Sequence, residues 1–534
     1  MSSANASTRH DASGETLARG AVVSSLAFLT SNLRAIFTVL IARLLGQAVL
    51  GTFGLAWAVA DLATKFGTLG LDYNVTARVA RCEALGDRRG SRQVLRDAVR
   101  TTLAAGLLVA FGGAWLTHQI GPRAGLRPEA VSATAALLFA VPGLALYRVC
   151  NGLSRGMKVI KHDVYSRGFT ESFVSVAVLL VAVLAGARLL APVMAAVAGT
   201  TASGLVALSL ARPLFSDRAG QDPIETAPAL QSPIAKKPAG SESVAGHGSW
   251  TQLLRGSIPI AVYDLLNIAV MRLDVIMLGL FVGRAPGVTP ETLGIYAAAV
   301  EVAGGLRKLS QAFTPILTPV LAEQLAAHDL RAAERSYGSV ARWMLAILLP
   351  IVIVLALAGG LVMSLFGHGF DTGRSWLAVA AAACALNAFV GLGEIVLLIE
   401  RPAWNVANTA AASITAVLLN LVLIPRWGAL GAALGMLAPY ALQGLLRGTE
   451  LPWLLGWRWP WATLARPWAL AIAALPPALL VRVLVDGRQG EAISGVVYAL
   501  GYFVAWRIAG LEPEDRAVIS RLQGGRLLGG AKPD

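Results

Sequence analysis

The chain is poor in cysteine, histidine and charge for its length. Among its 534 residues there are three Cys and six His, and Asp, Glu, Lys and Arg together make up 14%. The cysteines, Cys82, Cys150 and Cys384, lie far apart and form no Cys-x-x-Cys pair, which argues against a disulfide framework or a zinc site. A phosphate-binding Gly-x-x-x-x-Gly-Lys segment is also missing, so we expect no ATP hydrolysis by this chain.

Long apolar runs take up much of the sequence instead. Hydrophobic residues make up 56% of the chain, and the mean hydropathy is +0.63. The runs 101–116, 173–187, 343–365 and 409–424 approach or reach the roughly 20 helical residues that cross a bilayer. Strands of a membrane barrel would alternate apolar and polar residues, whereas these runs are apolar throughout. The sequence therefore predicts an all-α, polytopic membrane protein.

The apolar segments predict about fourteen transmembrane helices. Their approximate bounds are 20–43, 51–74, 99–119, 130–151, 164–186, 189–211, 254–282, 291–319, 340–364, 374–397, 404–424, 428–447, 464–485 and 491–509. Alternate loops carry groups of basic residues, such as Arg88, Arg89 and Arg92, whereas the loops between them mostly carry one each. By the positive-inside rule, the basic loops and both termini lie in the cytoplasm. Topology then accounts for the net charge of +14, and we expect no binding to nucleic acid.

Polar stretches divide the chain into parts. Residues 1–13 lack the basic-then-apolar pattern of a cleaved signal peptide, so we expect the first apolar helix to be retained. The longest polar stretch, 215–248, is rich in Pro, Ala and Ser and predicts a flexible cytoplasmic linker. The predicted parts are a cytoplasmic tail (1–19), an N-lobe of six helices (20–211), the linker (212–253), a C-lobe of six helices (254–447), two further helices (448–509) and a cytoplasmic tail (510–534).

The two predicted lobes echo each other in sequence. The matching segments are TFGL at 52–55 with TLGI at 292–295, and ALGD at 84–87 with AAHD at 326–329. Continued without a gap, the first match places Asp61 opposite Glu301. Coincidence is the alternative, because Gly, Ala and Leu match easily in apolar sequence. The paired acid favours a repeat, so we predict a pseudo-twofold arrangement of two six-helix lobes with two C-terminal helices appended.

Several short motifs, in their order and spacing, resemble those of polysaccharide exporters. They are Arg19-Gly20, Leu44-Leu45-Gly46, Gly51-Thr52-Phe53-Gly54, Gly67 with Gly70-Leu71-Asp72, Leu273-Asp274, Leu293-Gly294-Ile295-Tyr296, and Pro315 with Pro319 ending the eighth helix. The chain resembles the Wzx-type lipid-linked oligosaccharide flippases of the MOP superfamily, which also holds MATE drug exporters and peptidoglycan-precursor flippases. The resemblance covers the whole chain in helix count and in its division into six plus eight helices. It implies two lobes around a central cavity, alternating access, and an undecaprenyl-diphosphate-linked glycan as substrate.

From this resemblance we predict a flippase of the bacterial inner membrane. It would carry the lipid-linked oligosaccharide from the cytoplasmic to the outer leaflet for O-antigen, capsule or exopolysaccharide biosynthesis. A polysaccharide polymerase or a chain-length regulator is the expected protein partner. We expect no cofactor, with H⁺ or Na⁺ as the coupling ion.

Basic residues inside the predicted spans are the candidates for binding the diphosphate. An ionisable group in the bilayer core is costly unless it faces protein or water, so each one suggests a functional role. Arginine offers a planar fork suited to phosphate oxygens. The candidates are Arg34, Lys65 and Arg272. Basic residues near helix ends are instead predicted to snorkel to the interface; these are Arg43, Arg148, Arg307 and Lys308.

Acids inside the spans are the candidates for ion coupling. Carboxylates near mid-membrane can bind and release a proton or a cation, and the candidates are Asp264, Asp274 and Glu301. The alternative is structural: Asp61 would pair with Arg34, and Arg272 with Glu301, to lock neighbouring helices together. The sequence leaves both roles open.

Two other classes of protein remain as alternatives. A membrane glycan polymerase or glycosyltransferase would need clustered acids, arginines or histidines on sizeable outer loops, whereas the outer loops are short and the histidines scattered. We therefore predict that the chain is not an enzyme. A cation-coupled multidrug exporter would share the architecture, but it would favour an acidic cavity, whereas the predicted N-lobe places Arg and Lys within its spans.

Overall fold

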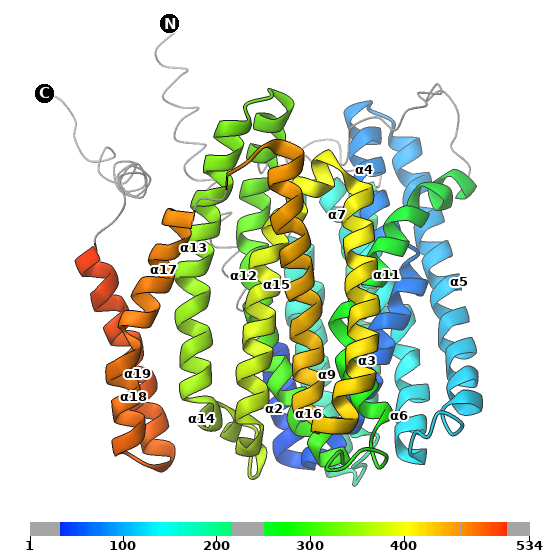
Figure 1. Cartoon of the computed structure of the whole chain (residues 1–534). Helices are drawn as coiled ribbons and strands as arrows, with labels where there is room; N and C mark the ends of the chain where they lie inside the picture. The colour runs from blue at the N-terminus through cyan, green and yellow to red at the C-terminus, as the bar shows by residue number, and fades with distance from the viewer. Residues whose placement is uncertain (1–32, 160, 216–249, 459–460, 510–534) are drawn as a thin grey trace, which may run out of the picture.

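The computed structural model describes residues 33–159, 161–215, 250–458 and 461–509, and within these ranges all regular structure is helical. Figure 1 shows the long helices standing side by side in one bundle. Ten of the described helical segments are long and apolar enough to cross a membrane. Each predicted span overlaps a helix, so the prediction of an all-α, multi-pass membrane protein is confirmed.

The helices of the N-terminal half cover residues 33–215. They are α2 (Leu33–Leu45), α3 (Gln47–Thr68), α4 (Leu71–Ala84), α5 (Arg88–Ile120), α6 (Pro128–Leu137), η1 (Leu138–Ala140), α7 (Val141–Gly156), α8 (Lys161–Asp163), the π-helical η2 (Val164–Glu171), α9 (Ser172–Leu184), α10 (Ala191–Ala211) and η3 (Arg212–Phe215). Most of the predicted linker and both predicted tails lie outside the described residues.

The helices of the C-terminal half begin at residue 250. They are α11 (Trp250–Leu280), α12 (Pro290–Ala326), α13 (Leu330–Leu357), α14 (Gly359–Ser364), η5 (Phe370–Gly373), α15 (Arg374–Glu400), α16 (Pro402–Leu455), α17 (Trp461–Ala473), α18 (Leu475–Leu484) and α19 (Gly487–Ala509). The helix α12 continues past Pro319 to Ala326, so the prediction that Pro315 and Pro319 end it is wrong. Membrane helices tolerate internal proline where neighbouring groups satisfy the freed backbone carbonyls.

The helix α16 is a hairpin of two antiparallel helices. The chain reverses at Gly428, whose φ of 55° and ψ of −130° are not helical. Across the hairpin, Trp404 stacks on Trp453 with ring centroids 5.4 Å apart, and the Asn408 amide donates to Glu450 Oε2 over 2.6 Å. These two arms correspond to the separately predicted spans 404–424 and 428–447.

The sequence echo between the halves corresponds to the same local structure. In each half a residue with positive φ, Gly86 (68°) or His328 (57°), ends a helix. The next residue, Asp87 or Asp329, caps the following helix by accepting a backbone N–H three residues on, at 2.8 Å and 3.0 Å respectively. The backbone N–H groups of both aspartates also bond five residues back, each over 2.9 Å. This agreement of turn and cap supports an internal repeat, because capping aspartates specify where a helix begins.

Glycines bring α3 of the first half against α12 of the second. A Cβ added at Gly51 would lie 2.3 Å from the Pro290 carbonyl oxygen, and one at Gly294 would lie 1.9 Å from the Gln47 carbonyl oxygen. Small residues at a crossing let two backbones approach closely in a membrane. Gly294 belongs to the echoed segment 292–295, and Gly51 directly precedes the echoed segment 52–55, so the contact between the halves at this end lies where the two sequences match.

The predicted second span, 51–74, is broken rather than continuous. The break between α3 and α4 lies at Leu69 and Gly70, which have φ values of 51° and 71°. A Cβ at Gly70 would come within 2.7 Å of the Ser257 carbonyl oxygen in α11. We call the line of contact from the Gly51–Gly294 crossing to the Gly70–Ser257 contact the interlobe seam.

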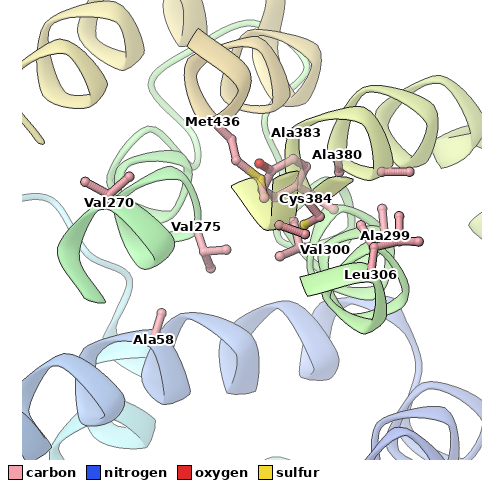
Figure 2. Packing of buried hydrophobic residues seen from close by; sticks show 14 of the residues in the cluster. Ala58, Val270, Val275, Ala299, Val300, Leu306, Ala380, Ala383, Cys384 and Met436 are labelled. Atoms are coloured by element: carbon pink, nitrogen blue, oxygen red, sulfur yellow. The ribbon is translucent and has the colours of Figure 1, made fainter. Parts of the chain in front are cut away.

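Part of the seam between these two ends is apolar. Figure 2 shows Ala58 of α3 facing α11, where Val270 and Val275 are labelled, and Ala299 and Val300 of α12 beyond it. All five side chains belong to one buried cluster. Their small size allows helices of the two halves to pack without a wide gap.

The last three helices pack mainly against the C-terminal half. The helices α17 and α19 pack against α13, and α19 also contacts α14. Figure 1 shows them at the edge of the bundle, beyond α13 and away from the N-terminal half. The Tyr502 hydroxyl of α19 donates to the Ala346 carbonyl of α13 over 3.0 Å, which fixes part of this attachment.

Substitution at the glycine crossing should weaken the contact between the halves. We expect Gly294→Val to lower the free energy of unfolding by about 1–3 kcal/mol. The new side chain would overlap backbone atoms, which cannot move aside as a flexible side chain can. The measurement is unfolding of the purified protein in detergent. The matched control is Gly112→Val, where an added Cβ meets no heavy atom within 4 Å. Equal stability of the two variants would contradict the crossing.

Candidate functional site

Five charged side chains meet in the middle of the interlobe seam. They are Asp61 and Lys65 of α3, Arg148 of α7, and Asp264 and Arg272 of α11, and we call them the central charge cluster. Asp61 lies 14 residues after the first residue of α3, which places it about 21 Å along the helix axis. The cluster therefore lies at membrane depth, where charged groups are found against partners or water.

Asp61 joins two arginines from different halves of the chain. Its Oδ1 accepts from Arg148 over 2.8 Å. Its Oδ2 accepts from Nε and a terminal nitrogen of Arg272 over 3.0 Å and 2.8 Å. The Asp61 residue is 5% exposed. Such multiply bonded, charge-assisted contacts are strong, and they hold α3, α7 and α11 in one arrangement.

Lys65 and Asp264 form the second ion pair across the seam. Lys65 lies one helical turn beyond Asp61 on the same face of α3. Asp264 lies two turns before Arg272 in α11, so the two ion pairs run along antiparallel helices. The cluster holds three cations and two anions. Asp72 of α4, which is 7% exposed, interacts electrostatically with Lys65, Asp264 and Arg148, so the buried charges of this region balance.

The structure changes several predicted pairings. Arg272 pairs with Asp61 rather than with Glu301, because α11 meets α3 along the seam. The prediction that Arg148 snorkels is wrong, since its side chain is 19% exposed and pairs with Asp61. Arg34 belongs to α2, but its side chain lies outside the described residues, so the predicted Arg34–Asp61 pair is not described.

Two of the predicted coupling acids lie outside the cluster. Asp274 is 1% exposed and accepts a hydrogen bond from the Tyr296 hydroxyl over 2.7 Å. Glu301 of α12 is partly buried, and no ion pair with another described residue is found for it. Only Asp264, of the three predicted acids, has a cation among its described partners at the seam.

The structure also reveals polar groups that the sequence reasoning did not include. Arg167 lies in the π-helical segment η2 and stands 5.9 Å from the ring centre of Tyr147, next to Arg148. π-helical segments are frequent at functional sites. The signal was available, because Arg167 is an arginine inside the predicted span 164–186.

A second buried polar group lies within the C-terminal half. Arg447 of α16 donates to Glu394 of α15 over 3.3 Å, to the Asn405 side chain over 3.0 Å and to the Val390 carbonyl over 3.0 Å. The Tyr263 hydroxyl of α11 also donates to Glu394. Arg447 is the last residue of the predicted span 428–447. Because an arginine at the end of a span usually snorkels to the interface, its sequence position did not reveal that it is buried.

Removal of Asp61 should be more damaging than removal of an exposed acid. We expect Asp61→Ala to cost about 3–5 kcal/mol, because it leaves Arg148 and Arg272 without their shared carboxylate. The measurement is denaturant unfolding in micelles. Glu323→Ala is the control, since Glu323 is exposed on a helix. Similar losses of stability for both variants would contradict the structural role assigned to Asp61.

Comparison with known proteins places this geometry in a family. The family of polysaccharide biosynthesis proteins matches residues 17–324, which is more than half of the chain. No curated protein matches the sequence.

Solved structures share the fold. An inward-facing multidrug resistance MATE family transporter of the MOP superfamily has a TM-score of 0.62 and 16% identity, over 79% of this chain and 95% of that one. The lipid II flippase MurJ in an inward closed conformation has a TM-score of 0.62 and 11% identity, over 91% and 97%. A MOP superfamily transporter from Pyrococcus furiosus has a TM-score of 0.54 and 13% identity, over 81% and 94%. At these identities the likeness concerns the fold. With the fold of the MOP superfamily transporters, this chain belongs to the family of polysaccharide biosynthesis proteins.

Proposed function

We propose that this chain is a flippase. It moves an undecaprenyl-diphosphate-linked oligosaccharide from the cytoplasmic to the outer leaflet of the bacterial inner membrane, for surface polysaccharide biosynthesis, by alternating access. The observation that carries the proposal is the central charge cluster, which lies between the halves with three cations and two anions. A diphosphate is a suitable ligand for such a site, because it brings several acceptor oxygens and negative charge. The family match supports a role in polysaccharide biosynthesis, and one solved structure of this fold is a lipid II flippase.

Diphosphate binding would exchange partners within the cluster. In this conformation Lys65 pairs with Asp264, and Arg272 pairs with Asp61. Both pairs join the two halves, so a ligand that competes for Lys65 and Arg272 also weakens the seam. The free energy of ligand binding would therefore shift the equilibrium toward a conformation in which the halves have separated, as transport requires. Arg34, from the neighbouring helix α2, is proposed as a further phosphate contact.

The same exchange suggests how an ion gradient enters the cycle. When Lys65 turns to the diphosphate, Asp264 loses its cationic partner and is left as a carboxylate at membrane depth. Binding of H⁺ or Na⁺ would compensate that charge. Asp264 is therefore the first candidate for coupling, with Asp274 and Glu301 as further candidates in the same half.

The direction of transport follows from the proposed orientation. The α4–α5 and α12–α13 turns lie at the same end of the bundle (Figure 1). That end carries Arg88 and Arg89 after the first turn and Arg331 and Arg335 after the second. We propose that this end faces the cytoplasm, by the positive-inside rule. A polymerase or chain-length regulator would then receive the glycan at the opposite end.

A multidrug exporter of the same superfamily is the main competing function, because MATE transporters share the fold. The charge of the seam favours the flippase. An exporter of cationic drugs needs acids that are free to bind its cargo, whereas both acids of the described cluster are paired with Lys or Arg. The proposal assigns no catalytic residue, since the cargo crosses the membrane intact.

Loss of the gene should trap a specific lipid. We expect cells without this protein to accumulate a complete oligosaccharide unit on its polyprenyl-diphosphate carrier, on the cytoplasmic side. The measurement is mass spectrometry of lipid extracts, with a membrane-impermeant lectin or oxidant to report the leaflet. Translocated but unpolymerised units would instead indicate a polymerase. Unchanged lipids together with sensitivity to cationic drugs would indicate an exporter.

Neutralising both residues of one ion pair tests substrate binding without leaving an unpaired buried charge that would itself destabilise the fold. The double variant Lys65→Met/Asp264→Leu removes the two charges together, so neither remains buried without its partner. We expect a stable protein whose transport falls about tenfold or more, because a charge-assisted contact to the diphosphate is lost. The measurement is restoration of surface polysaccharide in the deletion strain.

The control for this variant is Arg96→Met/Asp97→Leu, which removes a surface ion pair of 3.8 Å from α5. Full transport by a folded Lys65→Met/Asp264→Leu protein would exclude Lys65 from diphosphate binding. A second readout concerns Asp264: collapse of H⁺ and Na⁺ gradients should slow the wild-type protein but have little effect on the variant.

A further inference from the structure

A cavity lies at the end of the bundle opposite the arginine-rich turns. It has a volume of about 580 Å³, and three separate parts of the chain line it. Arg43 and Gln47 come from the α2–α3 turn, His368 and Phe370 from the segment between α14 and α15, and Arg488 from the start of α19. Figure 1 shows α2, α14 and the α18–α19 turn together at this end. It is an open hollow at the end of the bundle rather than an enclosed pocket.

Hydrogen bonds between the halves hold the wall of this cavity in place. Arg43 Nε donates to the Leu365 carbonyl over 2.7 Å. The Gln47 amide donates to the His368 carbonyl over 2.9 Å. Both bonds join residues more than 300 positions apart in the chain. The first bond uses Nε of Arg43, and within the described residues no hydrogen bond is found for its two terminal nitrogens.

The cavity is cationic, and the nearby acid is already used. No carboxylate lines it within the described residues, whereas two arginines and a histidine do. Glu491, close by in α19, is 6% exposed and accepts the Leu361 N–H over 2.7 Å. Its other partners are Arg374 at 3.7 Å and Arg482 at 3.4 Å. Glu491 therefore neutralises Arg374 and Arg482. Asp371 and Asp486 also lie at this end but do not line the cavity, and in the described part of the chain no ion pair is found for Arg43 or Arg488.

The position of these arginines is unusual for a membrane protein. Loops at the outer end of a polytopic protein are normally depleted in arginine. Here two arginines from separate loops converge on one cavity at the ends of membrane helices, which is the level of lipid head groups. An anionic ligand would offset the repulsion between the two arginines, because each guanidinium group can donate two parallel hydrogen bonds to phosphate oxygens.

We propose that this cavity binds the phosphate group of a lipid in the outer leaflet, through Arg43 and Arg488, with His368 as a further donor. Two lipids could supply this phosphate group: an anionic phospholipid, through its head group, or the translocated carrier lipid, through its diphosphate. The second source rests on the proposed flippase function, whereas the anion site itself does not. Because the two inter-half hydrogen bonds build the site, its occupation would favour the conformation in which this end is closed.

Lipid binding to the purified full-length chain tests the site directly. The probes are phosphatidylglycerol, undecaprenyl diphosphate and, as a neutral lipid, phosphatidylcholine, titrated into detergent-solubilised protein and read by native mass spectrometry and thermal shift. We expect Arg43→Gln/Arg488→Gln to weaken binding of at least one anionic probe about tenfold or more. The single variant Arg488→Gln should show part of the same loss, and it keeps the Arg43–Leu365 hydrogen bond that supports folding.

The control is Arg123→Gln/Arg188→Gln, which removes two exposed arginines from other loops predicted at the same end and outside the cavity. Loss of phosphatidylglycerol binding alone identifies a phospholipid site and leaves the flippase proposal to its own tests. Loss of undecaprenyl diphosphate binding alone identifies the carrier as ligand. Equal binding by the cavity variants, the control and the wild type overturns the site.

Discussion

A carboxylate buried at membrane depth must be matched by positive charge, and Asp61 meets that constraint with two arginines from different halves of the chain. The cost of an unpaired ion in the bilayer core makes the three groups one unit. This unit fixes how α7, α3 and α11 face one another, and it places Lys65 one turn away against Asp264. The ionic middle of the seam and the proposed substrate site are therefore the same set of side chains. In the proposed transport cycle, the contacts between the halves and an anionic substrate would compete for the same donors.

The two ends of the seam use a different kind of contact. At the Gly51–Gly294 crossing and at Gly70, backbone meets backbone with no side chain between them. Such contacts are short-ranged, so a small rotation of one half abolishes them, whereas ion pairs weaken gradually with distance. A seam with close-packed ends and an ionic middle can thus open at one end while the middle still holds the halves together. This order of events suits alternating access.

The sequence predicted the fold well and the site only in part. Spans are readable because each needs about 20 apolar residues, and the echo of ALGD with AAHD coincides with the same turn and helix cap in both halves. The charged positions Asp61, Lys65, Asp264 and Arg272 were also visible, because charge inside a span is rare. Their partners were not, since pairing depends on which helices are neighbours in space. Arg148 and Arg447 were missed as buried groups for a related reason: near the end of a span, a buried arginine and a snorkelling one have the same sequence signature.

The packing of α17–α19 against the C-terminal half would affect how the two halves move in the proposed transport cycle. Glu491 and Tyr502 tie these helices to the C-terminal half through polar contacts, so they travel with it as one body. That half consequently displaces more lipid for any given rotation and meets more viscous drag. During a rocking motion the lighter N-terminal half would take the larger share of the angular displacement. The proposed rocking motion would therefore be asymmetric, and the N-terminal half, with Lys65 and Arg148, would be the one that swings.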